Sequence, residues 1–186
     1  MKFKEIKKVH QGKYITRYDI VYEAKSGTSK TYEAISRNPS ITGFDDLHGK
    51  NPDAVVLIMH DESGERILLN REFRMAPGEW VYNFPAGLID PDENAAQASI
   101  RELREETGLT LTHIREVWKE SYSAVGFSNE KNVVIVGTAS GEITPSDSEM
   151  EEIEAAWYSK ESVRELLQSA PFAARTQAYC ALWSQT

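Results

Sequence analysis

Three glutamates lie close together in residues 87–109, which read GLIDPDENAAQASIRELREETGL. If this stretch is a helix, Glu102 and Glu106 stack one turn apart on one side, and Glu105 lies beside them. Three carboxylates so placed repel one another unless water solvates them or a cation binds among them. Carboxylate oxygens are ligands that Mg²⁺ favours in proteins. The spacing therefore predicts an acidic, solvent-facing side of a helix, which is either a solvated charge cluster or a metal site.

These glutamates belong to a longer pattern, G-x5-E-x7-R-E-L-x-E-E-x-G-L, whose other fixed positions include Gly87, Glu93, Arg101 and Gly108. From average residue usage, the pattern arises by chance in a chain of this length on the order of once in a million. It resembles the Nudix box with every defining position filled. The resemblance implies an enzyme, a metal-dependent hydrolase of nucleoside diphosphates linked to another moiety. Its cofactor would be Mg²⁺, with Mn²⁺ as a substitute.

The resemblance also implies a role for each position of the box. Glu102 and Glu106 would hold the metal together with the carbonyl oxygen of Ala86. Glu93 and Arg101 would form an internal ion pair that fixes the preceding loop on the helix. Gly87 and Gly108 would open and close the box as structural residues, and Glu105 would be a ligand, a nearby supporting group or the catalytic base.

Beyond the box, the stretches NREFR, NFPAGLID and GFSNE resemble the ADP-ribose pyrophosphatase branch of the family. That branch takes its general base from a loop after the box, which points to Glu130 in GFSNE. Glu130 reads equally well as a solvated loop acid, and Glu105 is the alternative base. Members specific for ADP-ribose typically carry a proline about sixteen residues beyond the box, where this chain has Val125. This departure leaves the substrate open, but not the reaction.

The same resemblance assigns substrate-binding positions. Arg74, at the end of an expected strand, matches the phosphate-binding arginine. Tyr32, Glu33 and Arg37, in YEAISR, match positions that bind the nucleotide base, where an aromatic ring can stack on adenine. Packing in a β-hairpin and a solvated charge are the competing interpretations for Tyr32 and Arg37. Trp80 and Tyr82 are alternative stacking groups that read equally as core residues.

Several elements must position these residues. Residues 1–45 predict two or three antiparallel strands that are too few to be stable alone. Strands are expected in residues 54–61, 66–74, 111–123, 132–140 and 151–159. Residues 76–87 read as a turn, a strand and then a loop held by Pro85 and Gly87, and residues 123–131 as another loop. The box helix would be capped by Asp92 or Asn94 and end at Gly108.

Helical periodicity predicts which side of the box helix and of the last helix packs against the rest of the protein. The box helix is expected to pack through Ala96, Ser99, Ile100, Leu103 and Thr107, with Ala95 and Ala98 on the acidic side. Two more helices follow at 159–168 and 173–185, the last packing through Ala174, Ala178, Ala181 and Leu182.

This order of elements predicts an α/β (α+β) sandwich of the Nudix type, with a mixed β-sheet between helices and an N-terminal antiparallel β segment. The expected division is residues 1–45, a β segment for dimerisation and substrate binding, and residues 50–186, the hydrolase domain containing the box at 87–109. An appendage of a few strands presents unpaired edges, so a homodimer is expected to cover them.

The composition of the 186-residue chain is that of an ordinary globular protein, with 40% hydrophobic and 27% charged residues. The formal net charge of −8 argues against a nucleic-acid polymer or an anionic membrane as partner. A single cysteine, Cys180, and the absence of a signal-like apolar segment fit a cytoplasmic protein. His10, His48, His60 and His113 show no ligand spacing and are expected to be structural.

The expected reaction is hydrolysis of the pyrophosphate bond of a nucleoside diphosphate sugar, ADP-ribose first, to a nucleoside monophosphate and a sugar phosphate. GDP-mannose, NADH and dinucleoside polyphosphates are alternative substrates. A non-catalytic Nudix-fold ligand sensor is a second hypothesis, although the complete set of box carboxylates argues against it. A structural or interaction module is a third hypothesis, but the sequence shows no exposed apolar run that would support it.

Overall fold

The computed structural model describes residues 1–48, 51–146, 148 and 150–186. The chain forms two compact units, the first made of Met1–Asp53 with Glu120–Asn132 and the second of Ala54–Lys119 with Val133–Thr186. The expected domain boundary at residues 45–50 stays a prediction, and its Lys50 lies outside the described residues. Among the described residues, no helix has the length and apolar character needed to cross a membrane.

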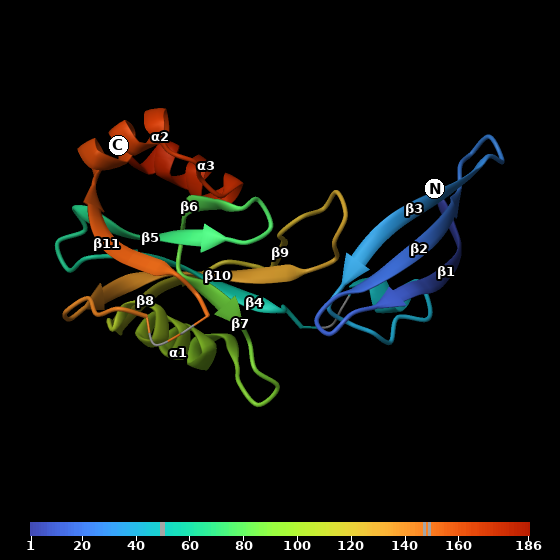
Figure 1. Ribbon diagram of the computed structural model, residues 1–186, viewed down its shortest axis with the longest axis horizontal. Coiled ribbons are helices and arrows are strands. Elements are labelled where there is room, and N and C mark those ends of the chain that lie inside the picture. Colours follow the sequence, from blue (N-terminus) through green and yellow to red (C-terminus); the bar gives the residue numbers. More distant parts are fainter. Residues whose placement is uncertain (49–50, 147, 149) are drawn as a thin grey trace. The chain divides into compact units, whose positions relative to one another are not determined.

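The first unit is built on a three-stranded antiparallel sheet with the order β1-β2-β3 (Figure 1). Its strands are β1 (Lys2–Gln11), β2 (Thr16–Glu23) and β3 (Ser29–Ser36), followed by the short 3₁₀ helix η1 (Asp45–His48). Alternate residues of β2 point to one face, and there Tyr18 and Ile20 form a small core with Ile41. This segment is the predicted N-terminal β segment.

The rest of the first unit is the segment that contains GFSNE. β9 (Ser121–Tyr122) pairs with the first residues of β10 (Lys131–Ser140). The loop between them lies along β3, where the backbone N–H of Ile35 donates to the carbonyl of Phe127 at 2.8 Å. Ile35 and Ser128 form a parallel bridge. The loop that was predicted at GFSNE therefore lies next to β3 and pairs with it at Ile35, in the manner of a short fourth strand.

The second unit holds the main mixed sheet, in which the order β11-β5-β4-β10-β8 is extended by β6 beside β5 and β7 beside β4. The remaining strands are β4 (Ala54–His60), β5 (Arg66–Arg74), β6 (Glu79–Asn83), β7 (Ala86–Leu88), β8 (Thr110–Val117) and β11 (Ile153–Ser159). β7 replaces the loop expected around Pro85 and Gly87, because this short stretch pairs with the edge of β4.

Helices cover both faces of this sheet, as Figure 1 shows, with α1 (Ala95–Thr107) on one side and α2 (Lys160–Ser169) and α3 (Ala174–Trp183) on the other. β4 is buried at every position because its two faces meet different cores. Leu57 packs in the cluster that includes Leu103 of α1, whereas Ile58 packs in the cluster that includes Val163 of α2 and Cys180 of α3. The predicted sandwich, a sheet between helices, is confirmed.

The predicted packing faces hold only in part: on α1, Ser99, Leu103 and Thr107 are buried as expected, whereas the face predicted for α3 is wrong. On α1, Ile100 is 53% exposed and Ala96 is also exposed, whereas Ala98 is fully buried. The buried face of the helix is thus rotated from the expected one, so that Ala98 and Glu106 of the acidic side are buried together with Leu103. On α3, Leu182 is 72% exposed and Thr176 and Cys180 are buried. There the neighbouring aromatic rings of Tyr179 and Trp183 fill the space against the sheet, which alanines cannot do.

Candidate active site

Helix α1 carries the acidic residues, and both of its ends are fixed by side-chain and backbone caps. Asn94, one of the two expected caps, accepts hydrogen bonds from the backbone N–H groups of Ala96 and Gln97, each at 3.0 Å. The Gln97 side chain in turn accepts from the backbone of Asn94 at 3.0 Å, which completes a capping box. Gly108 ends the helix with φ 75°, a left-handed conformation that favours glycine. These caps set the start and register of the helix that presents the glutamates.

Arg101 ties the loop before α1 to the helix. Its guanidinium donates to both carboxylate oxygens of Glu93, at 2.8 and 2.7 Å, and to the carbonyl of Leu88 at 2.9 Å. The same group donates to Glu102 at 2.8 Å and to Glu105 at 3.1 Å. The hydrogen bonds from Arg101 lower the pKa of Glu93. The Glu93–Arg101 pair has the geometry of a clamp, and it also reaches two of the site carboxylates.

Glu106 is buried, with 7% of its surface exposed, so the expected solvent-facing position is wrong for this residue. Burial raises its pKa well above the usual value, and the charges of Glu102 and Glu72 raise it further. The opposing contribution is a hydrogen bond of 2.8 Å from Asn70 Nδ2 to Glu106 Oε2. A carboxylate in this position is costly to ionise without a cation beside it.

Glu102 lies directly over Gly87. A β-carbon added to Gly87 would meet Glu102 Cδ at 1.9 Å and its two carboxylate oxygens at 2.0 and 2.1 Å. Only glycine allows this approach of side chain to backbone, which explains the first fixed glycine of the box. Ala86, the residue before it, opens β7 opposite Val56. Burial raises the pKa of Glu102, while the hydrogen bond from Arg101 lowers it.

The donor groups around Glu106 fit a hard divalent cation. The negative charges of Glu72, Glu102 and Glu151 all act on Glu106, and the donor set consists of oxygen atoms. In the described part of the chain, no three His, Cys, Asp or Glu side chains converge closely enough to form a metal cage. A cation here would therefore draw on Glu102 and Glu106 together with neutral oxygens such as the Ala86 carbonyl.

A buried polar network in the second unit escaped the sequence reasoning. Asn70, Glu72 and Arg74 occupy alternate positions of β5, so they share one face of the sheet. Glu72 accepts from Arg74 at 3.2 Å and from Asn83 Nδ2 at 2.9 Å, and Thr176 of α3 donates to Asn83 Oδ1 at 2.8 Å. The polar alternation within NREFR was the signal that could have indicated Asn70 and Glu72.

Glu151 is a second acid that the sequence reasoning missed. The charge of Glu151 raises the pKa of both Glu102 and Glu106, although Glu151 follows these two residues by more than forty positions in the sequence. Glu72, Arg74, Met75, Met150 and Glu151 line a pocket of about 260 Å³ in the second unit. The acidic site therefore continues into a pocket that contains the expected phosphate-binding Arg74.

The first unit brings together expected site residues from two distant segments. Arg37 Nε donates to Glu130 Oε2 at 2.7 Å, and Ser123 donates to Glu130 Oε1 at 2.8 Å. The Tyr32 hydroxyl donates to the carbonyl of Gly126 in the same loop. Glu33 instead pairs with Arg17 at 2.9 Å on the exposed side of the sheet. Arg37, Tyr32 and Glu130 thus form one cluster, from which Glu33 points away.

That cluster borders a largely apolar pocket of about 360 Å³ within the first unit. Its lining includes the aromatic residues Tyr18, Tyr22, Tyr32 and Phe127, together with Lys30 and Val125. The Lys30 ammonium lies 5.8 Å from the centre of the Tyr32 ring. Flat aromatic walls with a cation at the edge suit a planar, partly anionic ligand.

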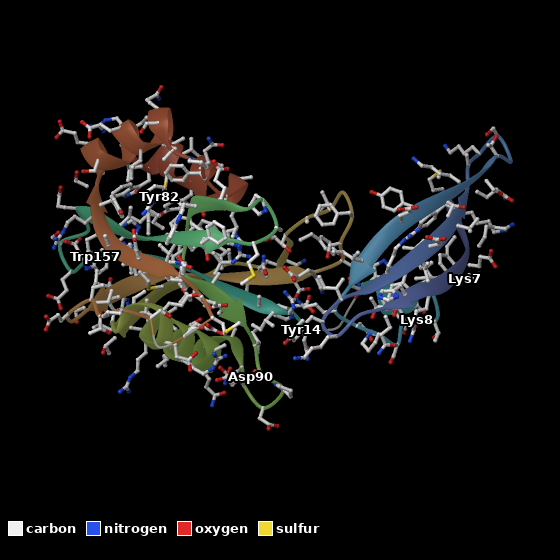
Figure 2. All side chains as sticks on the ribbon, in the orientation of Figure 1. Lys7, Lys8, Tyr14, Tyr82, Asp90 and Trp157 are labelled. Carbon is white, nitrogen blue, oxygen red and sulfur yellow. The ribbon has the colours of Figure 1, made fainter. Side chains whose placement is uncertain are left out.

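The alternative stacking residues are already in use. Figure 2 labels Tyr82, which stacks on Phe172 at 5.3 Å and meets the edge of Tyr158 at 5.8 Å. The guanidinium of Arg71 lies 4.4 Å from the centre of the Trp80 ring. The figure also labels Asp90, in the loop before α1, whose backbone N–H donates to Glu93 at 3.3 Å.

Comparison with known proteins places this geometry in a family. The family profile described as NUDIX domain matches residues 50–179. The ADP-sugar pyrophosphatase of Mus musculus is 30% identical over 106 residues, which cover 54% of this chain and 44% of that protein. The NAD-capped RNA hydrolase NudC of Pseudomonas aeruginosa is 30% identical over 118 residues, which cover 61% of this chain and 37% of that protein. The chain thus spans less than half the length of either relative.

A solved structure agrees on the fold. The crystal structure of an ADP compounds hydrolase matches with a TM-score of 0.72 and 19% identity, covering 100% of this chain and 93% of that one. The family profile spans more than half of the chain, and its match includes the capped helix that carries Glu102, Glu105 and Glu106. These findings confirm the family expected from the box: the chain belongs to the Nudix family.

Proposed function

We propose that the enzyme hydrolyses the pyrophosphate bond of a nucleoside diphosphate sugar, with ADP-ribose as the first candidate and Mg²⁺ as the cofactor. Water adds to one phosphorus, and the bond from that phosphorus to the bridging oxygen breaks. The products are a nucleoside monophosphate and a sugar phosphate. The observation that carries this proposal is the buried Glu106, whose ionised form is disfavoured by burial and by the charges of Glu102, Glu72 and Glu151, and which a divalent cation would stabilise.

Glu102, Glu106 and the carbonyl oxygen of Ala86 would hold the cation, and Mn²⁺ would substitute for Mg²⁺. When bound, the cation supplies charge neutralisation for the pyrophosphate oxygens during the reaction. Gly87 keeps the space that the Glu102 carboxylate needs. Arg101 restrains Glu102 and Glu105 by direct hydrogen bonds. Arg74, held by Glu72, is free to turn its remaining N–H groups toward a phosphate.

Three acids are candidates for the general base. Glu130 remains our first proposal, and Arg37 and Ser123 each donate a hydrogen bond to its carboxylate. Glu105 is the alternative within α1. Glu151 joins them because its charge acts on both Glu102 and Glu106. A base must lie within hydrogen-bond reach of the attacking water, so loss of the true base lowers kcat without weakening cation binding.

For the nucleotide base, we propose the aromatic pocket of the first unit, with Tyr32 stacking on the ring and Arg37 supporting it. An adenine compound is favoured because the two relatives carry names that refer to ADP-sugar and to NAD-capped RNA. GDP-mannose, NADH and dinucleoside polyphosphates remain alternative substrates, and Val125 lines this pocket where the ADP-ribose pattern has proline.

We also propose that the enzyme is a homodimer. In the first unit, β1 is an outer strand of the sheet, and unpaired strand edges favour pairing with another chain. Met1, Tyr14, Ile15 and Phe44 expose apolar surface on the same unit. A twofold dimer is the simplest closed assembly that covers such a surface.

A substrate panel tests the proposed reaction. ADP-ribose, GDP-mannose, NADH, an NAD-capped RNA and a dinucleoside polyphosphate would be incubated with the protein in Mg²⁺, in Mn²⁺ and in EDTA, and the products separated by chromatography. We expect AMP and ribose 5-phosphate from ADP-ribose at the highest kcat/KM, and none of either in EDTA. Binding of these compounds without turnover in any metal would instead support the ligand-sensor hypothesis.

A further inference from the structure

Asn70 is a buried polar residue of β5 with an incomplete set of hydrogen bonds. Only 1% of its surface is exposed. Its Nδ2 donates to Glu106 Oε2 at 2.8 Å, whereas its Oδ1 is buried and accepts no hydrogen bond from any described residue. A buried carbonyl-type oxygen without a partner is unfavourable, and in native proteins it commonly marks the place of a water molecule or an ion.

The orientation of the Asn70 amide follows from its neighbour. If the amide were turned over, Oδ1 would face the Glu106 carboxylate, and two acceptors would meet without a hydrogen between them. A carboxylate that binds a cation carries no proton, so with the cation bound only the orientation with Nδ2 on Glu106 gives a hydrogen bond. In that orientation, Oδ1 is necessarily the atom left for another ligand.

The distance between the two oxygens is limited by covalent geometry. Oδ1 and Nδ2 are bonded to the same carbon and lie less than ~2.6 Å apart. With the 2.8 Å hydrogen bond, Asn70 Oδ1 is within ~5.4 Å of Glu106 Oε2. Two oxygens that bind one Mg²⁺ from opposite sides are ~4.2 Å apart, so both can contact one cation after a movement of about 1 Å.

We infer that Asn70 belongs to the cation site, where its Nδ2 fixes Glu106 and its Oδ1 supplies a neutral oxygen ligand to the same cation. This inference rests on the proposed function, in which Glu106 holds the cation. The ligand role of Asn70 explains how a cation can be held at a site where fewer than three His, Cys, Asp or Glu side chains of the described residues converge. A neutral amide oxygen adds a ligand without adding to the repulsion among Glu72, Glu102 and Glu106.

Binding of Mn²⁺ without nucleotide, followed by electron paramagnetic resonance, tests the inference directly. Circular dichroism would first establish that each variant folds. We expect Asn70→Leu to weaken Mn²⁺ binding by tenfold or more, because both amide contacts are lost. We expect Asn70→Asp to bind Mn²⁺ at least as tightly as the wild type, because an oxygen ligand remains and now carries charge.

The Asn70→Asp variant separates a ligand from a residue that only orients Glu106, since an ionised aspartate side chain has no hydrogen to donate to Glu106. Weaker Mn²⁺ binding by Asn70→Asp than by the wild type would overturn the inference, even if Asn70→Leu did not fold. Asn83→Asp is the matched control, because Asn83 lies opposite Asn70 in the β5–β6 register and is also buried. If Asn70→Asp and Asn83→Asp gained Mn²⁺ affinity equally, the gain would come from the added negative charge alone and not from a ligand at position 70. This result would also overturn the inference.

The proposed function can fail separately. If the wild type and Glu106→Gln bind Mn²⁺ equally poorly, Glu106 holds no cation, and the proposed function fails together with the inference. If Glu106→Gln loses binding while both Asn70 variants bind like the wild type, the proposed function stands and only the ligand role of Asn70 is refuted.

Discussion

Substitution of Gly87 by alanine should disable the enzyme while leaving it folded. The new β-carbon would lie 1.9 Å from Glu102 Cδ. Carbon atoms in contact keep ~3.5 Å apart, so the Glu102 carboxylate must retreat by ~1.6 Å. Because this carboxylate is the end of a flexible side chain, the free energy of unfolding should fall by less than ~1 kcal/mol, and Tm by less than ~4 °C.

Activity should respond far more strongly than stability. A misplacement of ~1 Å at a catalytic group can lower the rate ~100-fold, so kcat of Gly87→Ala should fall by ~100-fold or more. Steady-state kinetics in Mg²⁺ would give kcat, and Mn²⁺ titration would show a parallel loss of cation affinity. The control is Gly43→Ala, where an added β-carbon has no neighbour within 4 Å. A folded Gly87→Ala enzyme with kcat and Mn²⁺ affinity like those of the control would refute the placement of Glu102 in the site.

Three further predictions concern other residues. Burial lowers the pKa of His60 to about 4, so the unfolded state binds more protons than the folded state between pH 4 and 6.5. The free energy of unfolding should therefore fall by up to ~3 kcal/mol as the pH drops through this range. Denaturant titrations at several pH values should show a smaller loss of stability for His60→Gln than for the wild type. Tyr32→Ala should raise KM for ADP-ribose more than it lowers kcat, because stacking stabilises ground state and transition state alike; a lowered kcat with unchanged KM would contradict the stacking role. The general base can be identified from three variants, Glu130→Gln, Glu105→Gln and Glu151→Gln. The variant that removes the base should lower kcat by ~100-fold or more and leave the Mn²⁺ affinity unchanged. If Glu130→Gln keeps its activity, the base is instead the acid whose substitution lowers kcat.

The order of strands and helices could be predicted because each element is encoded locally. β4 is a continuous apolar run, β2 alternates, and α1 has a cap at Asn94 and a glycine at its end. The sandwich follows from this order, since each sheet face must be covered. These parts of the fold need no knowledge of which strand pairs with which.

The orientation of α1 could not be predicted in the same way. Periodicity places charged residues in water, so it assigned Ile100 to the packed side and Glu106 to solvent. The structure does the reverse, with Ile100 exposed and Glu106 buried. A local rule of this kind is expected to fail at a functional site, where carboxylates are held against the protein for the sake of a ligand.

The buried network was out of reach for another reason. Asn70 meets Glu106 across 36 positions of sequence, and Asn83 meets Thr176 across 93. Such contacts depend on strand register and on the placement of α3, which no local pattern specifies. The cluster of Arg37 with Glu130 was anticipated only as two separate roles implied by family resemblance, and their 2.7 Å contact came from the structure.

The central claim is that Glu106 holds the cation on which pyrophosphate hydrolysis depends. Its most direct test is single-turnover hydrolysis of ADP-ribose by the wild type and by Glu106→Gln, each in Mg²⁺ and in EDTA. The account predicts AMP and ribose 5-phosphate from the wild type in Mg²⁺ alone. It also predicts a rate lower by several orders of magnitude for a folded Glu106→Gln. A folded Glu106→Gln enzyme that hydrolyses ADP-ribose at a near wild-type rate, or a wild type equally active in EDTA, would contradict it.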